Sequence, residues 1–158
     1  MSDPLTLKYR YQCNGNADGN NENSGGNVGD AFVNVDFALS RAYAAADQVT
    51  TIHLGILEEP SRDSEEKFPL QMVDRVCLVG AGADTTILDA VETGAVLVFD
   101  HVKGVAIQNL TIKNGLSDQY GGGLLIKSSD PVFEHIKIKE NRSKKGGGLF
   151  CRDASPVF

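Results

Sequence analysis

The sequence predicts an all-β chain wound as a parallel β-helix, a solenoid of stacked turns, with one α-helix near its N-terminal end. The segment GGGLLIKSSDPVF, residues 121–133, returns as GGGLFCRDASPVF, residues 146–158. Repeats of about 20 to 50 residues are typical of solenoids and propellers. Short apolar runs also follow one another from residue 50 onward with no helical pattern between them. Hairpin signals are weak, which favours stacked parallel strands over a sandwich.

The first segment, residues 1–30, is rich in Asn and Gly and reads CNGNADGNNENSGGNVGD over residues 13–30. This composition buries little apolar surface and predicts turns or a loop. We therefore divide the chain into this segment and a β-helix over residues 31–158. A calcium site is the alternative for the loop, because Asp18, Asn20 and Glu22 offer oxygen ligands. The alternating carboxylates and closing Glu of an EF-hand are missing, and no other cofactor is expected.

The next segment, NVDFALSRAYAAAD, predicts the α-helix over residues 34–47. Its apolar residues recur at steps of three and four and form one face. Asn34 is placed to cap the helix, and Asp36 lies in the first turn, where the helix dipole favours negative charge. The many alanines of the apolar face would let this helix lie close to the surface that it covers.

From residue 50 onward the pattern changes to short runs rich in Val, Ile, Leu and Phe, separated by Gly, Asp, Asn, Ser or Pro. Each run is typical of a strand. The runs are TTIHLGIL, FPLQMV, RVCLVG, TTILDA, AVLVF, VAIQNLTI, GGLLI, PVFEHIKI and GGLFC. One repeat therefore holds two or three strands and no helix, as one turn of a parallel β-helix requires.

The two copies of the repeat predict which side chains face the core, because successive residues of a strand point to opposite sides. We expect Leu124 to lie on Leu149 and Ile126 on Cys151, all pointing inward. Leu125 would lie on Phe150 and Lys127 on Arg152, all pointing outward. Three glycines, beginning at Gly121 and at Gly146, precede each of these strands where the chain must bend sharply, and glycine permits the positive φ that such a corner can require.

A looser match extends the repeat upstream with a slightly longer spacing. It places Leu97, Val98 and Phe99 on residues 124–126, and it places Asn114 on Asn141. Stacked Asn amides in successive turns would bond to one another and to the backbone. The change of spacing implies that the turns differ in loop length, as is usual in solenoids.

The charge and composition of the chain bear on partners and compartment. With a net charge of -6 the chain gains little from phosphate contacts, so nucleic acid is not expected as a partner. No apolar run is long enough for a membrane span, and MSDPLTLKYRY does not read as a signal peptide. Cys13, Cys77 and Cys151 form no metal-binding spacing, and the latter two sit in apolar runs, where a thiol usually packs in a core.

The repeats resemble a known family. GGGLLIKSSDPVFEHIKIKENRSKKGGGLFCRDASPVF is similar to the right-handed parallel β-helix repeats of the pectin-lyase-like superfamily, especially bacterial surface repeats of the polymorphic outer-membrane-protein type. Leu149-Phe150-Cys151 and Ala154-Ser155-Pro156 carry the likeness best. The upstream Gly/Asn loop, Ala-rich helix, TIHLG, FPL and VGAGADTTIL segments are similar to the N-terminal region of such proteins. The resemblance covers nearly all of the chain from about residue 19.

The resemblance implies a right-handed solenoid whose N-terminal helix plugs the open end of the core. It also implies an exported or cell-surface protein, of which this chain is the N-terminal portion, with its leader removed and further turns after Phe158. An uncovered last turn would associate end to end with another copy or pair with those further turns. Lyases of this fold, by resemblance, use acidic calcium ligands and a basic Arg or Lys, and no such signature is present.

Several other motifs of the sequence bear on possible chemistry. VCLVGAG, residues 76–82, imitates a dinucleotide-binding turn through Gly80 and Gly82, with Thr85 at the third position, but no crossover helix follows. His53, His101 and His135 lie in separate runs without nucleophile partners, which favours surface roles. Glu134, His135, Lys137 and Lys139 form one charged strip, which is interpreted as a solvated face. Binding of an acidic or neutral polysaccharide to this strip is the alternative.

The expected function is that of a non-catalytic structural or adhesive β-helix module with no catalytic residues. The alternative is a carbohydrate-binding or polysaccharide-degrading β-helix, a lyase or glycoside hydrolase if it is an enzyme. The fold itself does not decide between them, because one fold hosts many activities.

Overall fold

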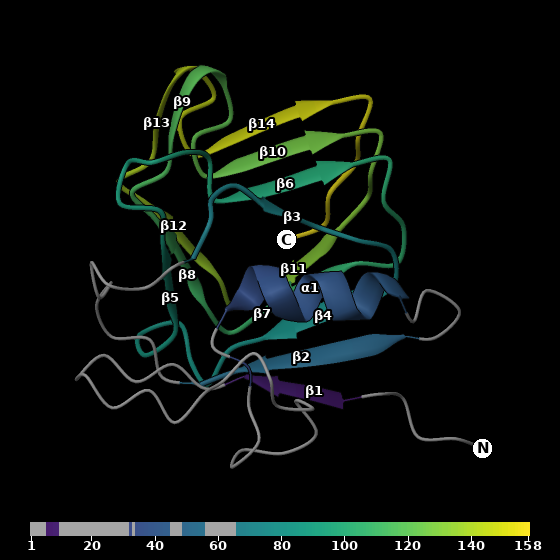
Figure 1. Ribbon diagram of the computed structural model, residues 1–158. Helices are drawn as coiled ribbons and strands as arrows, with labels where there is room; N and C mark the ends of the chain where they lie inside the picture. Colours follow the sequence, from purple (N-terminus) through teal and green to yellow (C-terminus); the bar gives the residue numbers. More distant parts are fainter. Residues whose placement is uncertain (1–5, 10–31, 33, 45–48, 56–65) are drawn as a thin grey trace.

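The computed structural model describes residues 6–9, 32, 34–44, 49–55 and 66–158 (Figure 1). Within these described residues one helix, α1 (Val35–Ala44), accompanies four parallel sheets. The largest sheet contains β1 (Thr6–Tyr9), β2 (Thr50–Leu54), β4 (Val76–Val79), β7 (Ala106–Gln108) and β11 (Val132–Glu134). We call it sheet A. Sheet C contains β3 (Leu70–Gln71), β6 (Leu97–Asp100), β10 (Leu124–Lys127) and β14 (Leu149–Arg152).

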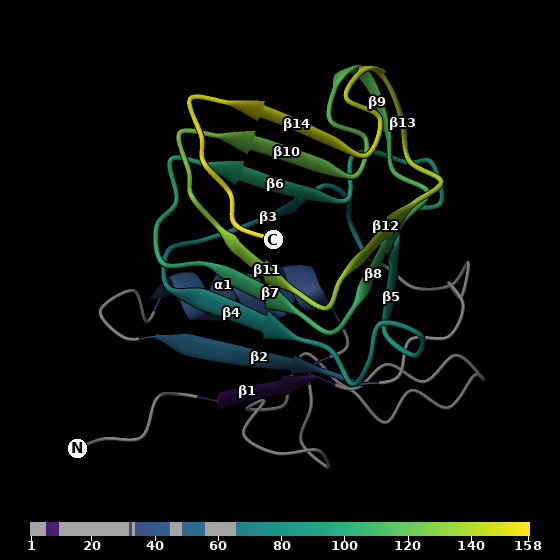
Figure 2. The ribbon, with the colours of Figure 1, turned by 180° about the vertical axis from the view of Figure 1, so that it is seen from behind.

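Two smaller sheets complete each turn. Sheet D contains β5 (Ile87–Asp89), β8 (Thr111–Lys113) and β12 (Lys137–Lys139). The β9–β13 ribbon consists of β9 (Leu116–Tyr120) and β13 (Arg142–Lys145), and it projects beyond the sheets (Figures 1 and 2). From β6 the chain passes through β7, β8 and β9 and returns to sheet C one level higher as β10. The predicted parallel β-helix is therefore confirmed.

The predicted stacking of the repeats is confirmed residue by residue in sheet C. Leu124 pairs with Leu149 and Ile126 with Cys151, as the two aligned copies of the repeat predict. Leu124 also pairs with Leu97, as the looser upstream match predicts. Val132 and Val157 of the two Pro-Val-Phe segments form a parallel bridge. The two copies of the repeat are thus adjacent turns of one solenoid.

The core lies inside the turns and is built from the inward column of each sheet. Leu124 and Ile126 are fully buried, whereas Leu125 and Lys127 between and beyond them are half-buried and face outward. Phe99 and Phe133, also buried, meet edge to face with ring centroids 5.7 Å apart. In β14 the inward residues are less covered: Leu149 is half-buried and Cys151 is exposed. Cys77 differs from the expectation of a core thiol, because it faces outward between the buried Val76 and Leu78.

The pairing of Asn114 with Asn141 is corrected by the register. Lys113 pairs with Lys139 and Leu116 with Arg142, so the spacing here is shorter than the one that would place Asn114 on Asn141. Asn114 therefore lies on Glu140, and both adopt positive φ. The two amides bond elsewhere: Asn114 Nδ2 donates to Asp89 Oδ2 at 2.8 Å, and Asn141 Oδ1 accepts from the Gly115 amide at 2.7 Å. Matching identical letters misled the prediction, because this corner needs a left-handed residue and not a particular side chain.

The corners of successive turns repeat one backbone conformation. His101, Ser128 and Asp153 each follow a strand of sheet C, and each has φ between 46° and 57°. Gly121 and Gly146, at the other end of the same strands, have φ of 60° and 64°, as predicted for these corners. Non-glycine residues in this region are uncommon, so their recurrence shows that the stacked corner imposes the conformation.

The helix lies beside β3, at the position that the next lower strand of sheet C would occupy (Figure 1). Val35, Ala38, Leu39 and Ala42 are its buried face and join the core, which is the role expected of a capping helix. It spans residues 35–44, and residues 45–47 of the predicted helix lie outside the described part. The first two helical amides, of Val35 and Asp36, donate to the two carboxylate oxygens of Glu66, at 2.7 and 2.9 Å. The helix N-terminus therefore has a charged cap from a residue distant in the sequence, and the backbone oxygen of Asn34 accepts from the Ala38 amide at 3.1 Å.

Among the described residues, no helix is both long enough and apolar enough to cross a membrane.

Candidate functional site

The outward face of sheet C, together with the β9–β13 ribbon, carries both aromatic and cationic side chains. Paired residues of β6, β10 and β14 lie above one another, so their outward side chains form columns on this face. One column holds Val98, Leu125 and Phe150, and the next, two positions further along each strand, holds Asp100, Lys127 and Arg152. Because the strands are paired in register, the position of each column is fixed by the ladder and not by its own side chains.

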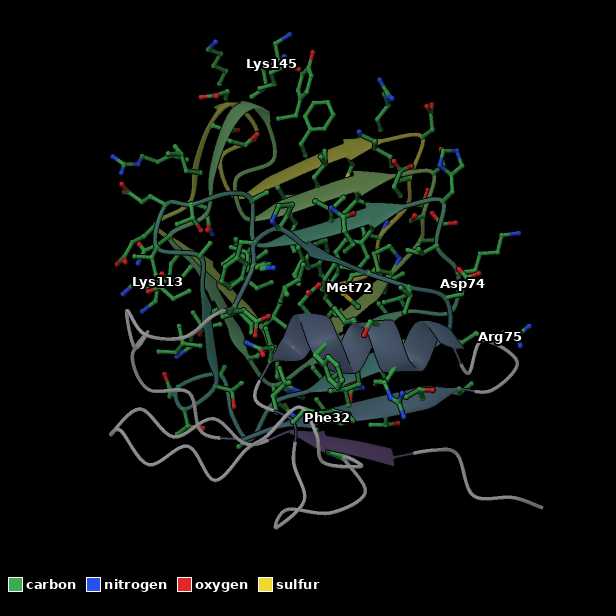
Figure 3. The ribbon with its side chains drawn as sticks, in the orientation of Figure 1. Phe32, Met72, Asp74, Arg75, Lys113 and Lys145 are labelled. Atoms are coloured by element: carbon green, nitrogen blue, oxygen red, sulfur yellow. The ribbon has the colours of Figure 1, made fainter. Side chains whose placement is uncertain are left out.

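The ribbon is joined to this face by an aromatic contact. Tyr120, the last residue of β9, lies with its ring centroid 4.5 Å from that of Phe150. Lys145 of β13 is labelled in Figure 3. Its Nζ lies 5.6 Å from the centroid of the Tyr120 ring. A cation near an aromatic ring contributes roughly 0.5–1 kcal/mol at an exposed site. Tyr120 is thus held between Phe150 and Lys145, which fixes the ribbon beside the start of β10 and β14.

The far end of the face is polar. Asp100 Oδ1 and His101 Nδ1 lie 2.5 Å apart at the corner after β6. His101 is exposed, and the side chain that it contacts among the described residues is the carboxylate of Asp100. Lys127 and Arg152, in the turns above Asp100, form no ion pair within the described part of the chain. The face therefore presents cations on both sides of the aromatic pair.

The charge of the chain is unevenly distributed along the sequence. Residues 1–100 contain 16 Asp and Glu against 6 Lys and Arg, whereas residues 101–158 contain 5 against 9. Residues 101–158 form the upper turns, which therefore carry more cations than anions. A ligand attracted to the upper part of this face would therefore be anionic or neutral and not cationic.

The charged strip predicted for Glu134, His135, Lys137 and Lys139 is not one strip. His135 adopts φ of 51° and forms a corner, so Glu134 belongs to sheet A and the two lysines to sheet D. Glu134 accepts a hydrogen bond from Gln108 Nε2 at 2.7 Å. Lys137 forms an ion pair with Asp84, and the hydrogen bond and charge of Lys137 lower the pKa of Asp84.

Two further ion pairs join different turns on this side. Arg142 is paired with Glu92, which lies 50 residues earlier, and Lys113 Nζ lies 3.4 Å from Glu140. The Asp84 and Glu92 pairs both reach over an intervening turn, since their partners lie two turns apart. These exposed pairs link the outside of the solenoid and leave few cations of sheet D free for a ligand.

The three histidines stay apart, as expected. His53 lies in β2 of sheet A, His101 at the corner after β6, and His135 at the corner after β11. Within the described residues no group of three or more His, Cys, Asp or Glu side chains is arranged to hold a metal ion. Asp18, Asn20 and Glu22, the candidate calcium ligands, lie outside the described residues.

The glycines of VCLVGAG have a structural role. A Cβ at Gly80 would lie 2.2 Å from the backbone oxygen of Asn109 in the next turn, so this position admits only glycine. Thr86 Oγ1 accepts from the Ala81 amide and donates to the Gly55 oxygen, both at 2.8 Å. Strand β5 follows, where a dinucleotide site would need a helix. Burial and the nearby Glu134 raise the pKa of the Cys77 thiol, which disfavours the reactive thiolate.

Sequence reasoning placed Phe150 on the outer face but missed Tyr120 and Lys145. Tyr120 lies in LSDQY, a polar run with no strand pattern, and Lys145 lies in RSKK. The available signal was position: each ends the ribbon strand that directly precedes a GGG block. Comparison of the chain with protein-family models, curated proteins and solved structures gives no match.

Proposed function

We propose that this chain is a non-catalytic structural and adhesive module of an exported or cell-surface protein, of the pectin-lyase-like, outer-membrane-repeat type. The observation that carries the proposal is the in-register ladder of sheet C, which holds columns of outward side chains at fixed spacing. The β9–β13 ribbon, braced by Tyr120, adds a fixed projection beside those columns. A stiff body with a fixed display face is what an adhesive spacer requires.

Two measurements test this proposal. An antibody against the folded chain should label intact cells of the organism that produces it, because the proposal places the chain at the surface. Incubation with a panel of polysaccharides, with and without calcium, should release no new chain ends. Absence from the cell surface and the medium would contradict the export, and cleavage of any polysaccharide would contradict the non-catalytic role.

Carbohydrate binding is the second candidate, and the Phe150 column is the specific observation that favours it. Sugar rings pack on aromatic side chains, and the flanking Lys127 and Arg152 favour a polysaccharide that carries carboxylates. A Phe150→Ala variant should then lose affinity for an acidic oligosaccharide such as oligogalacturonate, while Ser155→Ala, outside the face, should not. Equal affinity of both variants would exclude this face as the binding site. Degradation of the bound sugar would move the assignment to a lyase or hydrolase.

We also propose that β14 pairs with a further strand, either from additional turns or from a second copy. The exposure of Cys151 and the partial burial of Leu149 support this, since the equivalent Ile126 and Leu124 are fully covered. Sedimentation velocity over a hundredfold range of concentration, chosen as about two decades around a micromolar Kd, should show association. A Cys151→Pro variant, which removes an amide donor from the uncovered edge of β14 and leaves the donors to β10 in place, should weaken it.

A further inference from the structure

The corner between β8 and β9 carries an Asn–Gly pair, Asn114–Gly115, whose chemistry the proposed function does not use. Asn followed by Gly is prone to cyclise, because glycine has no side chain to hinder the approach of its backbone nitrogen. The Gly nitrogen loses its proton to water and bonds to Cγ of Asn, and Nδ2 leaves as ammonia. Water then opens the resulting succinimide at either carbonyl, which yields aspartate or isoaspartate.

The fold requires glycine at this position, so the chain cannot avoid the reactive pair by a substitution there. A Cβ at Gly115 would lie 1.9 Å from the backbone oxygen of Gly122 and 2.9 Å from Val96 Cγ2. Real Cβ atoms do not approach a backbone oxygen so closely. Asn114 itself adopts φ of 51°, a conformation in which Asn is enriched. The corner therefore requires glycine at residue 115 and favours asparagine at residue 114, and these two residues form the reactive pair.

The closed corner engages both reacting groups with other residues. The leaving amide, Asn114 Nδ2, donates to Asp89 Oδ2 at 2.8 Å. The attacking nitrogen, that of Gly115, donates to Asn141 Oδ1 at 2.7 Å, and Asn141 is itself held by a bond to the Ile112 oxygen. The Asn114 oxygen accepts from the Glu92 amide at 2.8 Å. Attack requires rotation of the Asn114 side chain and backbone, which breaks these bonds.

We propose that Asn114–Gly115 is a deamidation site gated by the fold, closed in the native corner and open when the β8–β9 corner unfolds locally. Both products then hinder closure. Aspartate at residue 114 places a second carboxylate against that of Asp89, where an amide now donates. Isoaspartate lengthens the backbone between Lys113 and Leu116, both of which are held in register by the next turn. Local opening of this corner thereby leads to a lasting covalent change, the conversion of Asn114 to aspartate or isoaspartate.

The test is peptide mapping by mass spectrometry of the full chain, incubated at neutral pH with and without denaturing urea. Deamidation at Asn114 should be slower in the native chain by roughly tenfold to a hundredfold, the factor that corresponds to one hydrogen bond to a charged group. The Asn14–Gly15 pair in the same digest serves as the reference for the chemistry. Equal rates at Asn114 in native and denatured chain would overturn the proposal.

Two variants separate gating from general unfolding. Asn141→Ala frees the Gly115 amide and should speed deamidation of Asn114, whereas Ser143→Ala, in the adjoining strand β13, should not. Circular dichroism must show that Asn141→Ala is folded; if it is not, Asp89→Asn, which keeps the shape of the partner, replaces it. A folded variant with an unchanged rate contradicts the gate. Asn114→Asp should unfold at lower urea than the natural chain, and an unchanged midpoint would contradict the effect of the product.

Discussion

Leu124 and Leu125 offer a sharp test of the solenoid register, because they are the same residue type at adjacent positions of β10. Leu124 faces the core between Leu97 and Leu149 and is fully buried. Leu125 faces outward between Val98 and Phe150 and is half-buried. Replacing each in turn by Ala removes the same atoms from the same strand, so the difference in stability reports which face is the core.

The size of the difference follows from burial. Leu→Ala removes about three methylene equivalents, worth about 2.4 kcal/mol at about 0.8 kcal/mol each, and a cavity adds to this cost. Leu124→Ala should therefore lower the free energy of unfolding by roughly 2.5–4 kcal/mol. The upper value is limited because Leu149 above it is only half-buried, so the cavity is able to relax. Leu125→Ala leaves no internal cavity and should cost about 1 kcal/mol.

Urea unfolding followed by circular dichroism measures the free energy of unfolding of both variants. A shift of the midpoint at an unchanged slope reports a change in stability. A cost for Leu125→Ala equal to or larger than that of Leu124→Ala would refute the register, since a slip by one residue exchanges the two faces.

Three further predictions concern separate contacts. Gly80→Ala should lower the free energy of unfolding, measured in a thermal melt, by roughly 1–3 kcal/mol, because its Cβ meets the Asn109 oxygen. Gly82→Ala meets only the Thr85 hydroxyl at 3.1 Å and should lower it by less than about 1 kcal/mol, and the reverse order would contradict the packing. Glu66→Ala should speed hydrogen exchange of α1 and cost about 1–2 kcal/mol, while Glu92→Gln, which removes one exposed ion pair, should leave α1 unchanged; equal exchange in both would refute the distant cap. The carboxyl of Asp84 should titrate below its ordinary pKa and return toward it in Lys137→Ala, as followed by NMR. Because its folded pKa is lowered, the small stabilisation from this pair is present above about pH 3.9 and lost as pH falls through the folded value, and a titration unaffected by Lys137→Ala would contradict the pair.

The fold was predictable where the chain repeats itself. The GGGL and PVF blocks set the spacing of the repeat, and the alternation of Leu124, Leu125, Ile126 and Lys127 then decides inside from outside. Parallel stacking forces like positions together, so a local pattern was sufficient to give the long-range contacts of sheet C. The helix was equally readable, because its apolar face has the helical period.

The contacts that failed prediction are those that depend on corner geometry. Asn114 and Asn141 are the same residue type but do not occupy equivalent positions in successive turns. The corner is defined by its positive φ, and Glu140 occupies it in the next turn. Glu134 and Lys137 are close in sequence, yet the His135 corner sends them to different sheets. Tyr120 and Glu66 meet partners that lie far away in the sequence, and no local pattern marks such pairs.

Disulfide trapping across β10 and β14 tests the stacked turns most directly, in a chain whose three natural cysteines are replaced by Ser. Lys127→Cys with Arg152→Cys places two outward thiols on paired residues, at the strand spacing of about 4.8 Å, within disulfide reach. Lys127→Cys with Phe150→Cys is the mismatched control, about 8 Å apart and beyond that reach. The stacked solenoid predicts an internal disulfide in the first pair and little or none in the second. Equal trapping in both pairs, or trapping only in the mismatched pair, would contradict it.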